Sequence, residues 1–109
     1  MDEFFDDYDV LVTADSPVQA MRHDDTGNEL HMTMTVNGRP RPWTDLVPWT
    51  ALANIDYLPA TTVPTGLGPS GLPVGCQVIG RGYTDRTTIA VASLLGDLTG
   101  GYQVPPSVR

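Results

Sequence analysis

Two apolar runs place the strongest constraint on the fold of this chain. Residues 10–12 (VLV) follow an aspartate, and residues 72–80 (LPVGCQVIG) carry apolar side chains that would face both sides of a strand. Runs of this kind are typical of strands covered on both faces. Such strands need neighbouring strands and helices on each side, and a chain of 109 residues offers few. We therefore expect this chain to be part of a larger sheet.

Local signals predict shorter elements in the first half of the chain. Residues 2–7 indicate the end of a helix, and residues 32–36 alternate as a strand does. Asn37-Gly38 is a strong signal for a tight hairpin turn. Residues 39–42 (RPRP) are expected to break any regular element, because proline lacks the amide hydrogen that helices and sheets need.

The second half predicts two helices and two strands. Gly75, inside the run at residues 72–80, suggests the close approach of another backbone. The remaining expected elements are a helix over 43–55 that starts near Thr44 or Pro48, a short strand over 60–63, and a helix from Thr84 that ends at Gly100-Gly101. The apolar stripe of the last helix comprises Val91, Leu94, Leu95 and Leu98, with Ile89 and Ala92 beside it. Strands separated by helices indicate an α/β fold with a mixed or parallel sheet.

Charge divides the chain into two segments of a single partial domain, 1–109. Residues 1–29 form an acidic strand-loop segment with nine of the thirteen acids and one arginine, and residues 30–109 form a nearly neutral helix-strand-strand-helix segment. The acidic field would repel a phosphate backbone, so we expect no nucleic acid partner. A solvated acidic surface is the favoured interpretation. Metal binding by Asp24-Asp25 with His23 or His31 is disfavoured because the spacing fits neither an EF-hand nor a zinc site, so no metal and no cofactor are expected.

Composition limits the chemistry and the compartment. All six basic residues are arginines, so these 109 residues cannot supply a catalytic lysine. Cys76 is the only cysteine and is expected to be a small buried hydrophobe, since no histidine is placed near it to make it a nucleophile. No apolar run approaches the roughly 18 residues of a membrane span. The acidic first residues do not resemble an export signal, so we expect a cytoplasmic chain without a membrane partner.

The segment from Asn54 to Gly80 resembles a known family. Its "LPATTVP" followed by "GLPVGCQVIG" is similar to the C-terminal signature of the amidase signature family, and "YDVLVTADSPV" is similar to an earlier strand of that family. "DRTTIAVASLLGDLTGGYQVPP" resembles the last helix and tail. "TVNGRPRPWTDL" is similar to a bacterial subgroup that hydrolyses cyclic amides and nylon oligomers. Tyr57 stands where the family usually has glycine, so we expect the local backbone geometry there to differ from that of the family.

The resemblance implies a C-terminal fragment of the amidase signature fold, a mixed sheet with flanking helices. Family members hydrolyse amide bonds with a Ser–cis-Ser–Lys triad, and this sequence has neither a lysine nor two adjacent serines. The chain is therefore expected to have no catalytic residues of its own and to be inactive alone. Met1 would then be an internal methionine of a longer amidase-like sequence, and the unpaired sheet edges predict a homo-oligomer.

The resemblance also suggests which residues line the substrate cleft. The candidates are Asp15, Ser16, Trp43, Asp45 and Trp49. Asp45 lies near the position of an acid in the glutamine-using members, although its spacing to Asn54 is two residues longer. Packing in a core or interface is the competing interpretation for the tryptophans, and solvent exposure or helix capping for the aspartates.

Three functions follow, in order of preference. The first is the C-terminal part of an amidohydrolase, which completes the sheet and one wall of a pocket for a small-molecule amide. The second is one subunit of a two-chain amidase, whose missing N-terminal chain brings the lysine and serines. The third is a non-enzymatic interaction module whose acidic first third contacts a basic partner.

Overall fold

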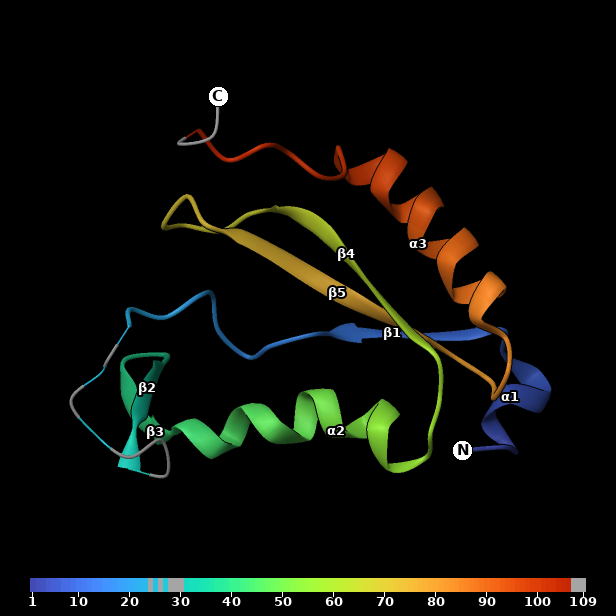
Figure 1. The fold of residues 1–109 in the computed structure, drawn as a ribbon, viewed down its shortest axis with the longest axis horizontal. Coiled ribbons are helices and arrows are strands. Elements are labelled where there is room, and N and C mark those ends of the chain that lie inside the picture. The colour runs from blue at the N-terminus through green and yellow to red at the C-terminus, as the bar shows by residue number, and fades with distance from the viewer. Residues whose placement is uncertain (24, 26, 28–30, 107–109) are drawn as a thin grey trace.

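The computed structural model describes residues 1–23, 25, 27 and 31–106. A three-stranded sheet lies at its centre, in the order β1 (Val10–Ala14), β5 (Pro73–Gly80), β4 (Ala60–Leu67). Helix α3 (Asp85–Thr99) lies on one side of the sheet and α2 (Val47–Ile55) on the other, as Figure 1 shows. Helices therefore flank a sheet, which confirms the predicted α/β class.

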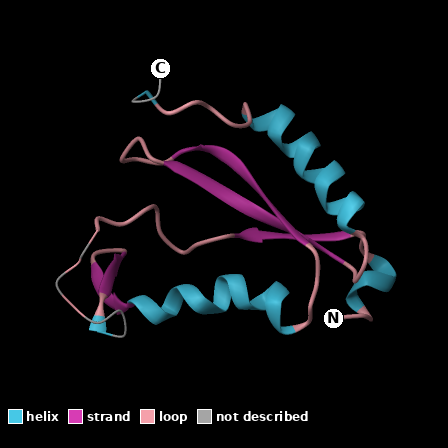
Figure 2. Cartoon of the chain, in the orientation of Figure 1, coloured by secondary structure: helices cyan, strands magenta, loops and turns pink. Residues whose placement is uncertain are grey.

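The direction of the strands differs from the prediction of a mixed or parallel sheet. Strand β5 pairs antiparallel with β1 and with β4. The β4–β5 connection is a hairpin with no helix in it, so the chain reverses and antiparallel pairing follows (Figure 2). Among the described strands of this sheet, the connection that contains a helix is the one from β1 to β4. These two strands do not pair with each other, because they lie on opposite sides of β5.

The central strand β5 is covered on both faces, as its apolar run predicted. Val78 and Ile79 are fully buried and point to opposite sides of the sheet, because side chains alternate along a strand. Ile79 packs with Phe5 of the short helix α1 (Phe4–Asp7) and with Ala53 of α2. Val78 packs with residues of β4 and α3. Strand β1 differs, because Val12 keeps 47% of its surface exposed at the edge of the sheet.

A second, two-stranded sheet is the hairpin formed by β2 (Thr33–Val36) and β3 (Arg39–Pro42). Asn37 and Gly38 both have positive φ, as a type I′ turn requires, so the turn prediction is confirmed. The prediction that residues 39–42 break regular structure is wrong. Val36 and Arg39 form the hydrogen-bonded pair next to the turn, and hydrogen-bonded and non-hydrogen-bonded pairs then alternate along the hairpin. Pro40 and Pro42 therefore fall in non-hydrogen-bonded pairs, where the missing N–H costs nothing.

Two further elements depart from their predicted limits. Strand β4 continues through Pro64 to Leu67, beyond the predicted residues 60–63, and an irregularity between Pro64 and Gly66 absorbs the proline on this edge strand. Residues 43–55 begin with a 3-10 turn, η2 (Trp43–Leu46), before α2 starts with Pro48 in its first turn.

Helix α3 contacts the sheet through only part of the predicted face, because Ala92, Val91 and Leu95 pack against the core while the rest of the predicted stripe does not. Thr88 and Ala92 are its buried residues, while Ile89, Leu94 and Leu98 are exposed. The helix approaches closely at Gly80, where an added Cβ would lie 2.7 Å from Thr88 Cγ2. Small side chains are therefore required where the helix approaches Gly80, and Leu94 and Leu98 lie outside the contact. Val91 and Leu95 of the predicted stripe are half-buried against the core. Gly100, with φ of 88°, ends the helix as predicted.

Candidate functional site

The side chain of Gln77 connects two parts of the chain that lie far apart in the sequence. Gln77 is buried on β5, and its amide nitrogen donates to the carbonyl oxygen of Ala14 at 3.3 Å and to that of Trp49 at 2.5 Å. Ala14 ends β1 immediately before Asp15 and Ser16, and Trp49 lies in the first turn of α2. One buried amide therefore fixes the loop after β1 relative to α2.

Asp15 and Ser16 follow β1 at the end of the sheet nearest this bridge. The Asp15 carboxylate packs over Gly75, where an added Cβ would lie 2.7 Å from Asp15 Oδ2 and 3.1 Å from the Val63 carbonyl oxygen. The close approach predicted at Gly75 is confirmed. The Ser16 hydroxyl donates to the Val18 carbonyl oxygen at 2.8 Å and accepts from the Val18 amide at 3.3 Å. Ser16 thus shapes its own loop.

Asp45 and Trp49 lie on the other side of the Gln77 bridge. Asp45 accepts from Arg41 of the hairpin, with its Oδ2 at 2.7 Å from Nε and 2.6 Å from Nη2. Trp49 is 39% exposed. Trp43 is half-buried, and its backbone amide donates to the Met32 carbonyl oxygen at 2.9 Å, which anchors the start of η2 to the hairpin.

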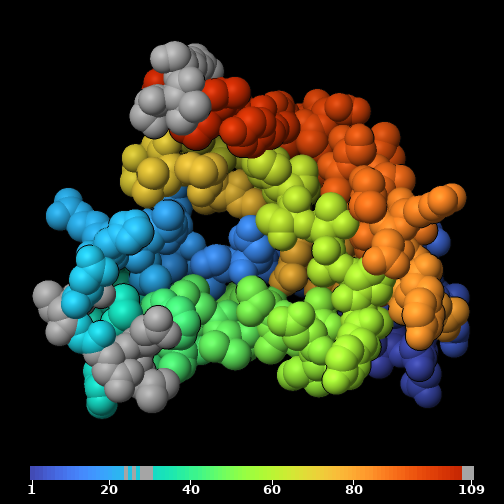
Figure 3. Space-filling view, viewed as in Figure 1, coloured from blue at the N-terminus to red at the C-terminus, as the bar shows by residue number. Residues whose placement is uncertain are grey.

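Four of the five residues predicted to line the substrate cleft line two adjacent hollows. One, of about 470 Å³, is lined by Asp15, Ser16 and Gly75 among others, and the second, of about 640 Å³, is lined by Asp45 and Trp49. Pro17 lines both. Trp43 lines neither. Figure 3 shows the face on which the loop after β1 (light blue) lies next to α2 (green).

Cys76 borders the first hollow only indirectly, through its neighbour Gly75. The side chain is half-buried, and burial raises the pKa of its thiol, with the nearby Asp15 carboxylate raising it further. A thiol of this kind is a poor nucleophile near neutral pH because the thiolate is the reactive form. This agrees with a packing role for Cys76.

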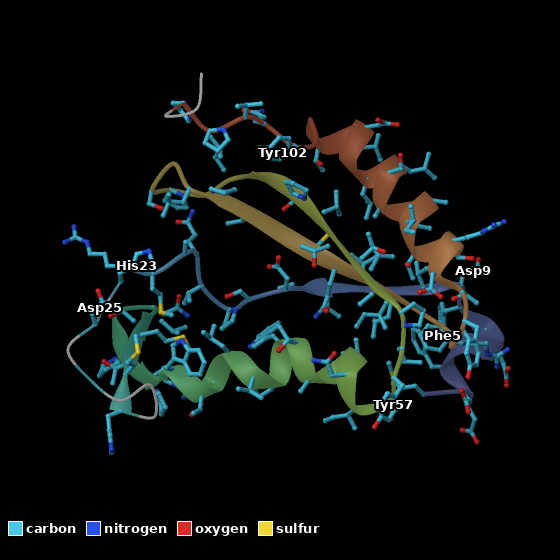
Figure 4. The ribbon with its side chains drawn as sticks, viewed as in Figure 1. Phe5, Asp9, His23, Asp25, Tyr57 and Tyr102 are labelled. Atoms are coloured by element: carbon cyan, nitrogen blue, oxygen red, sulfur yellow. The ribbon has the colours of Figure 1, made fainter. Side chains whose placement is uncertain are left out.

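The polar loop after β1 contains residues of the metal site that the sequence spacing argued against. His23 and Asp25 lie beside the β2–β3 hairpin (Figure 4), and Asp24 falls outside the described residues. The described part of the chain brings together no group of three or more metal-ligating side chains. In the same part of the chain, no helix has the length and apolar character that a membrane crossing needs.

The sequence pattern did not single out Gln77 or the arginines of the hairpin. Gln77 lies inside an apolar run that predicts only a strand, although a glutamine within an apolar run signals an internal hydrogen-bonding role. Arg39 and Arg41 were missed because the segment that holds them was expected to be irregular.

Comparison with known proteins identifies the group to which this chain is related. Residues 1–89 match the family model described as Amidase. The chain belongs to the amidase family. The A subunit of glutamyl-tRNA(Gln) amidotransferase from an Exiguobacterium species is 32% identical over 101 residues, which cover 93% of this chain and 19% of that protein. Its counterpart in Granulibacter bethesdensis is 33% identical over 93 residues, 85% of this chain and 17% of that protein.

A relative whose name states a different activity shares the same region. Fatty acid amide hydrolase of Arabidopsis thaliana is 29% identical over 101 residues, which cover 86% of this chain and 15% of the plant protein. This amidase-family chain spans a fifth or less of the length of these curated relatives.

Tyr57 stands where the resemblance predicts glycine in this amidase-family chain. Its φ is 53°, in the left-handed region that glycine favours, and its side chain is 93% exposed at the end of α2 (Figure 4). The backbone keeps a glycine-like conformation while the ring projects into solvent.

Proposed function

We propose that this chain forms one wall of the substrate cleft of an amidase-family enzyme that hydrolyses carbon–nitrogen amide bonds. In this proposal residues 1–109 are one partial domain, and the nucleophile and general base come from residues outside it. The observation that carries the proposal is the family match over residues 1–89. The absence of lysine from these residues supports an external source for the base.

The geometry around Gln77 supports a role in the cleft. The bridge from Gln77 to Ala14 and Trp49 holds the Asp15–Ser16 loop and α2 at a fixed separation. Rigid support of this kind is what a substrate wall needs, because small misplacements of binding groups lower rates strongly. We assign Asp15, Ser16, Asp45 and Trp49 to the wall, and Trp43 to its support.

The substrate proposed is a small-molecule amide. The names of the relatives cover a fatty acid amide hydrolase as well as part of an amidotransferase, so the family spans several amide substrates. The similarity of the "TVNGRPRPWTDL" segment to hydrolases of cyclic amides and nylon oligomers favours a compact aliphatic amide. In this proposal the catalytic residues belong to the rest of a longer amidase-like enzyme; in the alternative, a separate N-terminal amidase chain supplies them in a two-chain enzyme.

A reconstitution experiment tests the proposal. An amidase-family polypeptide is truncated before the segment that matches this chain, so that it keeps its own lysine and serines. Hydrolysis of a panel of primary, secondary and cyclic aliphatic amides is then measured, as released ammonia or newly formed amine, for each chain alone and for the mixture. We expect neither chain to be active alone and the mixture to hydrolyse at least one amide.

The control is the truncated polypeptide mixed with its own excised segment. If that pair recovers activity while the mixture with this chain stays inactive, the proposed role as a cleft wall is wrong. Hydrolysis by this chain alone would contradict the proposed external source of the catalytic residues.

A further inference from the structure

The β2–β3 hairpin presents a face that combines positive charge with apolar surface. Met34 is paired with Arg41, and Val36 with Arg39, and residues paired across an antiparallel ladder lie on the same face. All four side chains line the same hollow of about 640 Å³. The other face of the hairpin carries the threonines and prolines that alternate with them.

The wall opposite the hairpin is apolar. Trp49 and Pro48 of α2 and Pro17 of the loop after β1 line it. Trp49 is partly exposed, so its indole ring is accessible to a bound molecule. The hollow is therefore an apolar slot with arginine side chains along one side.

The charges in the hollow do not cancel. Asp45 is held by Arg41 through two short contacts, so these two charges largely neutralise one another. Arg39 has no ion-pair partner among the residues that the structure describes. The whole chain has a formal charge of −7, whereas residues 33–42 contain two arginines and no acid. An excess positive charge is thus placed beside an apolar slot in an otherwise acidic chain.

We propose that this hollow binds a small carboxylate with an aliphatic chain, with Arg39 receiving the carboxylate and Trp49, Val36 and Pro17 packing on the chain. Arginine suits this role because its planar guanidinium donates two parallel hydrogen bonds to a carboxylate. Arg41 is oriented by Asp45 and bounds the site. The inference rests on the proposed function and deepens it, because it makes the preferred amide one that also carries a carboxylate at the far end of an aliphatic chain.

Binding is tested on the 109-residue chain itself, without any catalytic step. The indole N–H signals of the two tryptophans are followed by two-dimensional NMR during titration with hexanoate, and a Trp43→Phe variant assigns the Trp49 signal. We expect a saturable shift of the Trp49 signal. Hexanamide and hexylammonium, which have the same chain length without the negative charge, should bind at least about tenfold more weakly.

Substitutions then separate charge recognition from apolar contact. Arg39→Gln should lower the affinity for hexanoate about tenfold or more, and Arg39→Lys should retain part of it. Arg86→Gln removes another exposed arginine on α3, far along the chain from the hollow, and should leave binding unchanged. Circular dichroism of each variant checks that the fold is kept.

Three results would overturn the proposal: no saturable shift of Trp49, equal binding of hexanoate and hexanamide, or equal losses from Arg39→Gln and Arg86→Gln. The outcome is separable from that of the reconstitution. An active two-chain mixture with no hexanoate binding would remove only the carboxylate preference. An inactive mixture with specific hexanoate binding would keep the site and remove the amidase role.

Discussion

The side-chain amide of Gln77 lies 2.5 Å from the carbonyl oxygen of Trp49 and joins the central strand to α2 within the protein interior. Replacing Gln77 by alanine removes this hydrogen bond and the one to Ala14 and leaves two carbonyl groups without that donor. We expect the free energy of unfolding to fall by about 1–3 kcal/mol, measured by urea denaturation. Gln19→Ala is the matched control, because its two hydrogen bonds, to the Leu72 carbonyl and from the Ser70 hydroxyl, are both exposed and should together be worth less than about 1 kcal/mol. Equal losses in both variants would contradict the bridging role of Gln77.

A second interior hydrogen bond joins β4 to α3. The hydroxyl oxygens of Thr61 and Thr88 lie 2.9 Å apart, and the Thr88 hydroxyl also lies 2.8 Å from the Asp85 carbonyl oxygen of its own helix. A double-mutant cycle with Thr61→Val and Thr88→Val should give a coupling free energy of about 0.5–1.5 kcal/mol. Strictly additive losses would show that the two hydroxyls do not interact.

Tyr57 should be replaceable by glycine with a gain in stability. A left-handed backbone costs a non-glycine residue about 1–2 kcal/mol, and part of this is offset by the greater freedom of glycine in the unfolded chain. We therefore expect Tyr57→Gly to raise the free energy of unfolding by about 0.5–1 kcal/mol, measured by urea denaturation. Tyr102→Gly is the control, since Tyr102 is exposed but has no positive φ. A loss of stability in Tyr57→Gly would contradict this prediction and would mean that the exposed ring makes a contact that stabilises the fold.

Cys76 should react slowly with iodoacetamide near neutral pH. Burial, followed by the Asp15 charge, raises the pKa of the thiol, so less thiolate is present at a given pH. The reaction rate of Cys76 should therefore still rise with pH where the rate of a cysteine in the unfolded chain has reached its plateau. Asp15→Asn should move the rate profile to lower pH, by a modest amount because Asp15 is the smaller cause. Asp56→Asn, remote in sequence and exposed, should not move it. If the rate reached its plateau at the same pH as in the unfolded chain, or at a lower one, the burial of the thiol would be contradicted.

Self-association of the isolated chain is expected from its exposed apolar side chains. Leu94 and Leu98 on α3 are 63% and 83% exposed, and Val12 is exposed on the edge strand β1. Light scattering over a dilution series should give at least the mass of a dimer. Leu94→Glu combined with Leu98→Glu should shift the mass toward the monomer. A monomeric wild-type chain at micromolar concentration would contradict this prediction.

Local sequence signals predicted the features that depend on local geometry. Asn37-Gly38 specified its turn because few residues adopt positive φ readily, and Gly100 ended α3 for the same reason. The apolar run around Val78 and Ile79 identified the central strand, because adjacent residues of a strand point to opposite faces and are both buried only when both faces are covered.

Features set by register and by contacts distant in sequence could not be predicted in the same way. Pro40 is compatible with β3 only because the hairpin register places it in a non-hydrogen-bonded pair. The periodicity of α3 gave the correct helix but only part of its contact face, since the close approach to Gly80 selects Thr88 and leaves Leu94 and Leu98 exposed. Gln77 became a candidate only when its partners in β1 and α2 were located.

The pairing of β1 with β5 has a consequence for the order in which this protein can fold. Val10 pairs with Gly80 and Ala14 with Cys76, so the first of the described strands pairs with a strand that is synthesised more than 60 residues later. During synthesis, β1 must therefore wait on the ribosome until most of the chain has emerged, while the β2–β3 hairpin between them can close at once. Contacts of such long sequence separation slow folding, so newly made β1 is exposed to chaperones and to neighbouring chains for longer than the other described strands.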